Sequence, residues 1–360
     1  MKILVTGGMG LIGHNVVQRL NRLDHFVSII DNETNYGIIP QAEIDYLMEE
    51  RGMKIGCQHL YKASIESADT IDYVIRVQQP EVIVHMASFP RQKVVNANPA
   101  HGADVMMRGL INVLESAKRY GVRRFVYMSS SMVYGDFADQ VTEDAVCSPI
   151  GQYGIMKLAG EWLVKDYARR TGMEYVILRP SAVYGPLDVE DRVVAKFMLR
   201  AMRGQVLSVN GASETLDFTY VDDAADGVVA AALEASAAND TFNITKSHSV
   251  SLLQAAEMIV KIVGKGTIEC RDRDADFPTR GALNIDRAKV ILGFDPKVDV
   301  EQGFENYKYV ISEANILTGA AENAIYYGNF IQSVLDFVIV AFVIFMIVKS
   351  MNKASQISKN

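Results

Sequence analysis

Tyr153 and Lys157 lie four residues apart in a stretch whose apolar residues recur at helical spacing. Residues at that separation share one face of a helix, so the two side chains are expected to point into the same space. A tyrosine with its ordinary pKa of about 10 is a poor base at neutral pH, but an adjacent ammonium group favours the phenolate and lowers that pKa. The pair indicates proton transfer, although a tyrosine and a lysine at this spacing also occur on helices by chance.

A second group with chemical meaning is the glycine-rich segment TGGMGLIG, which closes one predicted strand and opens a predicted helix. Gly7 permits a tight turn, Gly10 lets the backbone approach a pyrophosphate, and Gly13 allows close contact between helix and strand. The first helical peptide groups, around Leu11 and Ile12, would meet the phosphate charge. In this setting the segment predicts a dinucleotide site, and the alternative is a structural turn.

Asp31 ends the next predicted strand, 18 residues after Gly13. A carboxylate at that point accepts hydrogen bonds from the adenosine ribose hydroxyls and repels a 2′-phosphate. The adjacent Asn32 belongs to the same predicted site. The sequence therefore favours NAD over NADP, and the alternative for Asp31 is a solvated loop acid.

Short apolar runs alternate with amphipathic stretches through residue 180 and predict the framework that positions these groups. The runs expected to form buried parallel strands are Ile3–Thr6, Phe26–Asp31, Val82–Met86, Phe125–Ser129 and Tyr175–Arg179. Helices are expected over Gly10–Leu23, Gly102–Tyr120 and Tyr153–Thr171, the last two followed by the capping glycines Gly121 and Gly172. This alternation predicts an α/β fold with a Rossmann-type doubly wound parallel sheet.

The regularity changes after residue 180, which predicts a division of the chain. Residues 1–180 are expected to form the NAD-binding domain, to which a later segment, about 217–245, returns. Residues 181–317 are expected to form a smaller mixed α/β lobe that binds the substrate, and residues 318–360 a hydrophobic helical tail.

Over about residues 1–315 the sequence resembles the NAD-dependent epimerase/dehydratase family of extended short-chain dehydrogenase/reductases, and within it the UDP-glucose 4-epimerases. The glycine spacing is GxxGxxG. The other motifs that carry the likeness are His85-Met86-Ala87-Ser88, SSSMVYG from Ser129, Tyr153-Gly154-Ile155-Met156-Lys157, Leu178-Arg179-Pro180, Val183-Tyr184-Gly185-Pro186 and DFTYVDD from Asp217. Each motif is modest alone, but their order and spacing together are specific.

The resemblance implies a nucleotide-diphosphate sugar as substrate, NAD as cofactor and a homodimer. It implies that Tyr153 takes a proton from the sugar as hydride passes to NAD, that Lys157 also holds the nicotinamide ribose, and that Ser130 bonds the reacting oxygen. The implied cofactor contacts are Gly7, Gly10, Leu11, Ile12, Gly13, Asp31, Asn32, Ser64, Ile65, Met86, Ala87, Ser88, Tyr153, Lys157 and Pro180, and the substrate contacts are Ser131, Arg273 and Lys93.

The residues after Ser130 discriminate among the reactions of this family. The dehydratases and decarboxylases carry a glutamate where this chain has Met132, and the dehydratases usually an aspartate where it has Ser131. A thioether cannot act as a general acid, so elimination of water is disfavoured. No cysteine lies in the segment 129–135, which argues against 3,5-epimerisation. The sequence favours 4-epimerisation, with another nucleotide-sugar oxidoreduction or epimerisation as the alternative.

Several positions depart from the family pattern, mostly in the substrate-binding half. Leu216 replaces an arginine that grips the diphosphate, so Arg273 is the candidate for that charge, with Lys93 and Arg91 as weaker candidates. Ser64 stands where an aspartate is usual, and its hydroxyl can still accept from the adenine amine. Other replacements of usual asparagines, at Met106 and Ala182, favour a second hypothesis, a non-catalytic NAD-binding module; the intact serine, tyrosine and lysine argue against it.

Composition narrows the other classes of function. The chain has 360 residues and a formal net charge of −7, with no dense basic run before the C-terminus, so nucleic acid is not an expected partner. Its three cysteines are far apart, and neither a metal site nor a disulfide framework is expected. The N-terminus enters a strand and a glycine turn at once, unlike a secretory signal. The catalytic part is expected in the cytoplasm.

The tail contains an apolar segment, Phe330–Val348, interrupted only by Gln332, Ser333 and Asp336 and followed by three lysines. Its length is sufficient to cross a bilayer. Residues 322–353 resemble the second transmembrane helix of the large-conductance mechanosensitive channel, whose first helix is missing, so a gated pore is not expected. The alternatives are membrane association through 330–348, a packing helix, and a fused fragment without a role. The downstream lysines favour a cytoplasmic C-terminus, which conflicts with a simple anchor for a cytoplasmic enzyme.

Overall fold

The computed structural model describes residues 1–34, 37, 39–56, 59–275 and 277–313. Met1–Lys308 form one compact unit. The predicted tail, 318–360, with its apolar segment 330–348, lies outside the described residues. Within the described ranges, every helix is too short or too polar to cross a bilayer.

A seven-stranded parallel sheet forms the centre of the larger unit and confirms the predicted fold class. Its strand order is β11-β6-β5-β4-β1-β2-β3, so the chain moves outward in both directions from the middle, as in a doubly wound fold. The strands are β1 (Lys2–Thr6), β2 (Phe26–Asp31), β3 (Leu60–Lys62), β4 (Val82–His85), β5 (Arg124–Met128), β6 (Glu174–Pro180) and β11 (Asp240–Ile244).

The five predicted strands are confirmed to within one residue at each end. Their central residues are almost completely buried, as expected for strands covered on both faces. Two edge strands were not predicted. β3 is only three residues long and none of these is buried, so its sequence carries no apolar run, and β11 lies far along the chain, beside β6.

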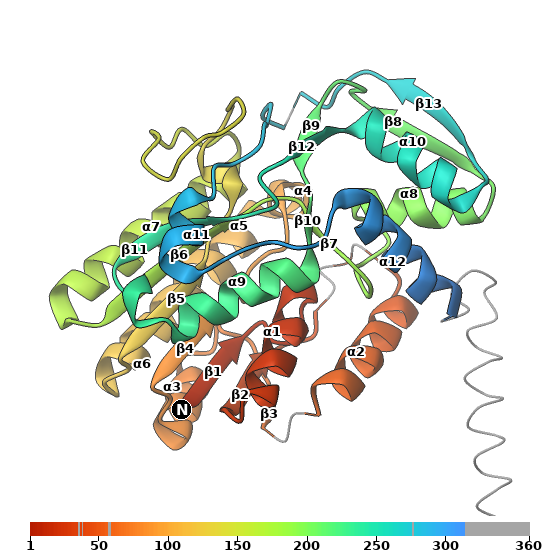
Figure 1. Cartoon of the computed structure of the whole chain (residues 1–360). Coiled ribbons are helices and arrows are strands. Elements are labelled where there is room, and N and C mark those ends of the chain that lie inside the picture. The colour runs from red at the N-terminus through yellow and green to blue at the C-terminus, as the bar shows by residue number, and fades with distance from the viewer. Residues whose placement is uncertain (35–36, 38, 57–58, 276, 314–360) are drawn as a thin grey trace, which may run out of the picture. The chain divides into compact units, whose positions relative to one another are not determined.

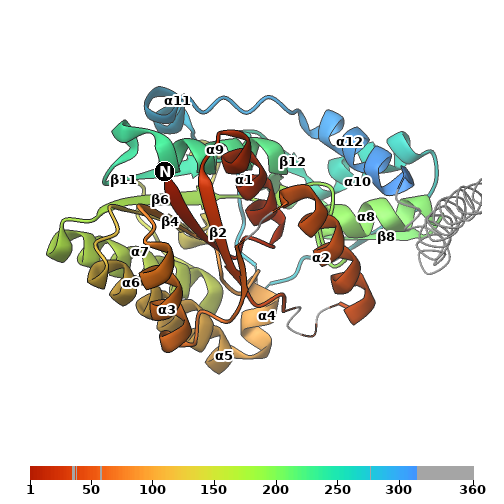
Figure 2. The same cartoon turned by 90° about the horizontal axis from the view of Figure 1, so that it is seen from below.

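Helices cover both faces of the sheet, as Figures 1 and 2 show. One face carries α1 and α9 with α11, and α2 packs beside α1; the opposite face carries α3, α6 and α7. Each layer buries its own apolar cluster against the strands. The helices are α1 (Leu11–Arg22), α2 (Gln41–Ile55), α3 (Ala68–Gln78), α6 (Leu110–Arg119), α7 (Gln152–Thr171), α9 (Val221–Leu233) and α11 (Asp286–Leu292).

The helix predicted over Gly102–Tyr120 is interrupted, and this prediction was wrong in detail. The segment is divided into α5 (Pro99–Ala103), a π-helical turn at Asp104–Gly109, and α6. At the end of that turn a Cβ on Gly109 would lie 2.7 Å from Ile65 Cδ1, so the backbone approaches the neighbouring loop closely. Apolar spacing does not distinguish a π turn from an α-helix with the same buried face.

Beyond β6, the chain builds a smaller layer that lies at the upper right of Figure 1. It consists of three short strand pairs and the helices that pack on them. The pairs are β7 (Val183–Tyr184) with β10 (Thr219–Tyr220), β8 (Val206–Asn210) with β13 (Thr267–Arg271), and β9 (Thr215–Asp217) with β12 (Ser249–Ser251). The helices are α8 (Val193–Met202), α10 (Leu252–Val263) and α12 (Val300–Glu313), whereas α4 (Gln92–Ala97), which precedes β5, packs on α5 and α7.

The segment 217–245 contributes to both layers. Its first residues form β10, whereas α9 packs on α1 and β11 pairs with β6 in the main sheet. The chain therefore passes from the lobe back to the sheet before it forms α10.

Candidate active site

A single cavity of about 640 Å³ gathers nearly all the predicted site residues at the carboxyl ends of the central strands. Ligands of doubly wound folds bind at this edge, where the strand order reverses. The predicted residues that line it are Gly7, Gly10, Leu11, Ile12, Gly13, Asp31, Asn32, Ser64, Ile65, Met86, Ala87, Ser88, Lys93, Ser130, Ser131, Tyr153, Lys157 and Pro180. Arg273 is the one predicted contact that does not line it.

The glycine turn has the close approaches that its spacing predicts. Gly7 has a φ of +74°, and a Cβ there would lie 2.7 Å from the backbone nitrogen of Ala87. A Cβ on Gly13 would lie 2.1 Å from the carbonyl oxygen of Gly7, so α1 can pack this close to β1 only without a side chain. Gly10 precedes α1 and lines the cavity, which leaves the first amides of that helix facing it.

Asp31 stands at the far end of the turn and is already hydrogen-bonded to the backbone. Its two oxygens accept from the amides of Met9 at 2.9 Å and Glu33 at 2.8 Å. Burial raises the pKa of Asp31, while these amides and the nearby Arg51 lower it. Each carboxylate oxygen has more than one lone pair, so the ribose hydroxyls can still be accepted.

Ser64, expected near the adenine, makes a local contact instead of presenting a free hydroxyl. Its Oγ donates to Glu66 Oε2 at 2.8 Å and accepts from the Glu66 amide at 3.2 Å. The residue still lines the cavity. A different serine, Ser88, has a buried Oγ with no hydrogen-bond partner among the described residues, on the same wall as Met86 and Ala87.

This end of the cavity fits a dinucleotide. The glycines of the turn and the first amides of α1 match a pyrophosphate. The carboxylate of Asp31 matches a ribose diol, and the unpaired hydroxyl of Ser88 matches a further polar group. Gly7, Gly10, Gly13, Asp31 and Ser88 are the residues that would hold it.

Tyr153 and Lys157 lie together in the first turns of α7, with Lys157 Nζ 5.8 Å from the centre of the Tyr153 ring. Lys157 is almost fully buried and donates to the carbonyl of Met128 at 2.7 Å. Burial lowers the pKa of Lys157 to about 7, which Glu161 partly offsets. Ser130 follows β5, and its Oγ accepts from the amide of Met132 at 3.2 Å.

The pKa of Tyr153 differs from the sequence-based expectation. Burial raises it above the ordinary value of 10, and the groups that lower it are Arg192 and the hydroxyl of Ser130. Lys157 directs its ammonium group to a backbone carbonyl. Arg192, just before α8, lines the cavity and donates to the carbonyl of Pro90 at 3.1 Å. It belongs to no family motif identified in the sequence, and only folding brings it to Tyr153.

A buried ion pair fixes the helix that carries Tyr153 and Lys157. Glu161, one turn after Lys157, accepts from Arg179 on β6 through both oxygens, at 2.9 and 2.7 Å, and from Ser129 Oγ at 2.5 Å. Glu161 and Arg179 are both almost fully buried. The contact therefore ties α7 to β5 and β6 just below the reactive side chains.

The lobe presents a different arginine from the one the sequence favours. Arg273 is 44% exposed, pairs with Glu214 at 3.4 Å and donates to the carbonyl of Phe277 at 2.7 Å. Arg280, seven residues later, lines the cavity with Leu216, and its Nη1 lies 3.6 Å from the sulfur of Met132. No motif marks Arg280 in the sequence; it follows the arginine that the family pattern singles out.

Comparison with known proteins places the chain in a family. The sequence model of the NAD dependent epimerase/dehydratase family matches residues 3–245. The chain therefore belongs to this family, and its cofactor is NAD. A second model, that of the large-conductance mechanosensitive channel, matches residues 289–360, most of which lie outside the described part of the chain.

Individual relatives align with almost the whole described chain. The "uncharacterized UDP-glucose epimerase YtcB" of Bacillus subtilis is 29% identical over 313 residues, covering 85% of this chain and 96% of that protein. UDP-glucuronic acid decarboxylase 3 of Arabidopsis thaliana is 28% identical over 315 residues, covering 84% and 86%. The solved UDP-glucuronic acid 4-epimerase of Bacillus cereus, bound to UDP-glucuronic acid and NAD, superposes with a TM-score of 0.80 at 27% identity over 87% of this chain and 99% of that one.

Proposed function

We propose that the protein is an NAD-dependent nucleotide-sugar epimerase that inverts the sugar at C4. The observation that carries the proposal is the meeting of Ser130, Tyr153 and Lys157 with the glycine turn in one cavity. The names of the relatives, which include UDP-sugar epimerases, support a nucleotide sugar as substrate.

The chain's own residues supply position and proton transfer. Tyr153 removes the proton of the sugar hydroxyl and later returns it, and Ser130 holds the same oxygen by a hydrogen bond. Lys157 holds the nicotinamide ribose, and Arg192 adds positive charge that favours the phenolate of Tyr153. NAD, when bound, would supply the hydride chemistry that interconverts the two sugar epimers.

The residue at position 132 supports epimerisation over the other reactions of the family. Met132 is 6% exposed, and its sulfur faces Arg280. A thioether neither gives nor takes a proton at neutral pH. The glutamate that dehydratases and decarboxylases place here is absent from the sequence, so the acid or base step that it would perform has no group at this position.

The proposal is tested with the purified full chain and no added NAD. UDP-, GDP- and dTDP-sugars are incubated with the protein, and the C4 epimers are separated by chromatography. Tyr153→Phe should lower turnover by about 10²- to 10⁴-fold because it removes the proton-transfer group. Bound NAD should be retained, since the aromatic ring is kept. Tyr73→Phe, at a half-exposed position on α3, is the matched control.

Two outcomes would contradict this function. Turnover that survives Tyr153→Phe would remove the mechanism. A wild-type chain that binds NAD but converts none of the sugars would favour the non-catalytic NAD-binding module.

We also propose a homodimer formed through the helices that follow β4 and precede β6. Ile155 and Trp162 are 52% and 64% exposed and lie seven residues apart on α7, and Ile111 on α6 is 38% exposed. Large exposed apolar side chains on neighbouring helices are typical of interaction surfaces. Light scattering should report a dimer, and Trp162→Lys should shift it toward monomer; a monomeric wild type would contradict the proposal.

A further inference from the structure

Arg280 places an incompletely paired positive charge in the wall of the cavity. Its Nε is buried and has no hydrogen-bond partner among the described residues. Its Nη1 faces the sulfur of Met132 at 3.6 Å, and a thioether is a weak acceptor. Burial lowers the pKa of Arg280 to about 10, and Glu214 raises it, but Glu214 is also paired with Arg273 at 3.4 Å.

The backbone around Arg280 is fixed from both sides. Its strand-like segment bridges Phe137, and the amide of Gly281 donates to the carbonyl of Phe137 at 3.0 Å. Thr215 Oγ1 donates to the carbonyl of Arg280 itself. A Cβ on Gly281 would lie 2.5 Å from the amide nitrogen of Asp139, so the two loops lie in direct contact.

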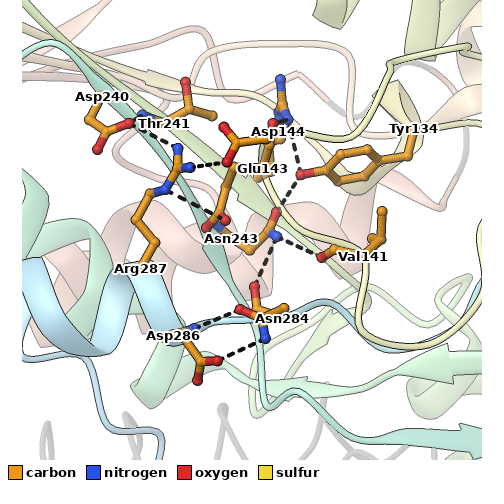
Figure 3. Close-up of polar contacts among 11 residues, drawn as sticks. Tyr134, Val141, Glu143, Asp144, Asp240, Thr241, Asn243, Asn284, Asp286 and Arg287 are labelled. Carbon is orange, nitrogen blue, oxygen red and sulfur yellow. Dashed lines mark hydrogen bonds and ion pairs between the residues drawn. The ribbon is translucent and has the colours of Figure 1, made fainter.

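A polar network anchors these two loops to the sheet, as Figure 3 shows. Asn243 on β11 accepts from Tyr134 Oη at 2.8 Å and donates to the carbonyls of Val141 and Asn284 at 3.2 and 2.9 Å. Glu143 accepts from the amide of Asn243 at 2.8 Å. The loops that carry Phe137 and Arg280 are thus tied to β11, and these contacts hold the backbone that presents the guanidinium.

The place of Arg280 is close to the reacting end of the substrate. Met132, which the guanidinium faces, donates its amide to Ser130 Oγ at 3.2 Å. Ser130 is the hydroxyl proposed to hold the reacting sugar oxygen. Arg280 contacts Met132, the residue whose amide donates to this hydroxyl, so the positive charge of Arg280 lies beside the sugar.

A separate group of cations is available for the diphosphate. Arg91 and Lys196 line the cavity from the loop after β4 and from the start of α8. Arg91 and Lys196 share the carboxylate of Asp191. These side chains come from other elements than Arg280, so the substrate's diphosphate does not require Arg280 as its partner.

We propose that Arg280 binds a carboxylate on the sugar, and that the substrate is a nucleotide-linked uronic acid. The inference rests on the proposed epimerase function and names its substrate class. A guanidinium and a carboxylate form two parallel hydrogen bonds, which match in shape and charge. Arg280 is a specificity residue, because a neutral hydroxymethyl group leaves its charge unpaired.

The test compares UDP-glucuronic acid with UDP-glucose as substrates of the full-length protein. The wild type should prefer the uronic acid in kcat/KM by at least about tenfold, the value of one charge-assisted hydrogen bond. Arg280→Met should lower kcat/KM for the uronic acid by about 100-fold and change that for UDP-glucose by less than about threefold. Arg280→Lys keeps the positive charge but not the two parallel donors of the guanidinium. Its kcat/KM for the uronic acid should lie between those of the wild type and of Arg280→Met.

A second variant supplies a carboxylate from the protein itself, in place of the carboxylate of the substrate. Met132→Glu should pair with Arg280 and reduce use of the uronic acid at least about tenfold, whereas Met132→Leu should not. Arg271→Met, at an exposed arginine paired with Glu269, is the control for loss of a positive charge nearby. Retained NAD and an unchanged Tm establish that each variant is folded.

The outcomes separate this inference from the function on which it rests. An equal loss with both sugars in Arg280→Met would assign the arginine to the diphosphate and overturn the inference while epimerisation stands. A wild type that prefers UDP-glucose would also overturn it. If neither sugar nucleotide is converted or bound, the proposed function fails and the inference with it.

Discussion

The two ends of the cavity are built in different ways. The cofactor end consists mainly of backbone and small residues: Gly7 and Gly13 have no room for a Cβ, and Asp31 is held by backbone amides. The opposite end consists of long charged side chains, such as Arg192 and Arg280, which reach in from the lobe. A site made of backbone constrains the sequence locally, whereas a site made of long side chains can be assembled from distant positions.

The ends also differ in their charge balance. At the cofactor end the partly buried carboxylate of Asp31 already has hydrogen-bond donors. At the sugar end Arg280 has a buried nitrogen without a partner in the described structure. The first arrangement stabilises the turn itself, and the second leaves interaction energy for a ligand. Four substitutions test this contrast.

The largest effect is expected where the two ends meet, at Lys157. Lys157→Met should lower turnover by about 10³-fold because the nicotinamide ribose and the proton-transfer site lose their cation. The same variant should make the NAD-free chain more stable at pH 6 to 7, by up to about 4 kcal/mol, because burial holds the pKa of Lys157 at about 7 against 10.5 in the unfolded chain.

The stability of the wild type should depend on pH because the folded and unfolded chains bind different numbers of protons at Lys157. Between pH 7 and 10.5 the unfolded wild type binds more protons at Lys157 than the folded form, so its stability rises with pH in this window. The variant lacks this rise, and its advantage should shrink as the pH approaches 10. Urea unfolding at several pH values measures the difference, and a constant difference would show that Lys157 is not held neutral by burial.

The next largest effect tests whether the cofactor end depends on its backbone. Gly13→Ala places a Cβ 2.1 Å from the Gly7 carbonyl oxygen and must move α1 away from β1. We expect a loss of about 3 kcal/mol in the free energy of unfolding and about 100-fold weaker NAD binding. Gly52→Ala on α2, whose nearest atom is 4.0 Å away, is the control and should be neutral or slightly stabilising. Equal behaviour of the two variants would contradict this account of the turn.

A smaller effect is expected at Asp31. Asp31→Asn keeps one acceptor but loses the negative charge, so NAD should bind about tenfold more weakly and NADP relatively better. Titration of both cofactors, with Asp69→Asn on α3 as control, measures the ratio. An unchanged preference for NAD would place the ribose elsewhere.

The smallest effect is expected at Arg192. Arg192→Met removes a charge that lowers the pKa of Tyr153, so the acid limb of the pH–rate profile should move upward and turnover at pH 7 should fall a few-fold. Arg203→Met, at the end of α8 and paired with Glu190, should leave the profile unchanged. A lower rate with an unshifted profile would mean that Arg192 acts only by holding the loop at Pro90.

The sequence determined the cofactor end almost completely. The five strands, the glycine turn and the Tyr153–Lys157 pair could be read directly, because each depends on contacts between residues close in the chain or on the period of a strand or helix. The exceptions near this region have local reasons: β3 is too short and exposed for a signal, and the π turn before α6 keeps the apolar face of an ordinary helix.

Only the tertiary structure showed which charged side chains form the sugar end of the cavity. Arg273 and Arg280 are seven residues apart in an irregular segment, and nothing in their spacing indicates which one enters the cavity. The bridge to Phe137, the contact of Gly281 with Asp139 and the network around Asn243 turn Arg280 inward. Each joins residues 100 or more positions apart, except for the contact of Asn243 with Asn284. The charge that selects a ligand here is set by loop packing, which sequence periodicity does not encode.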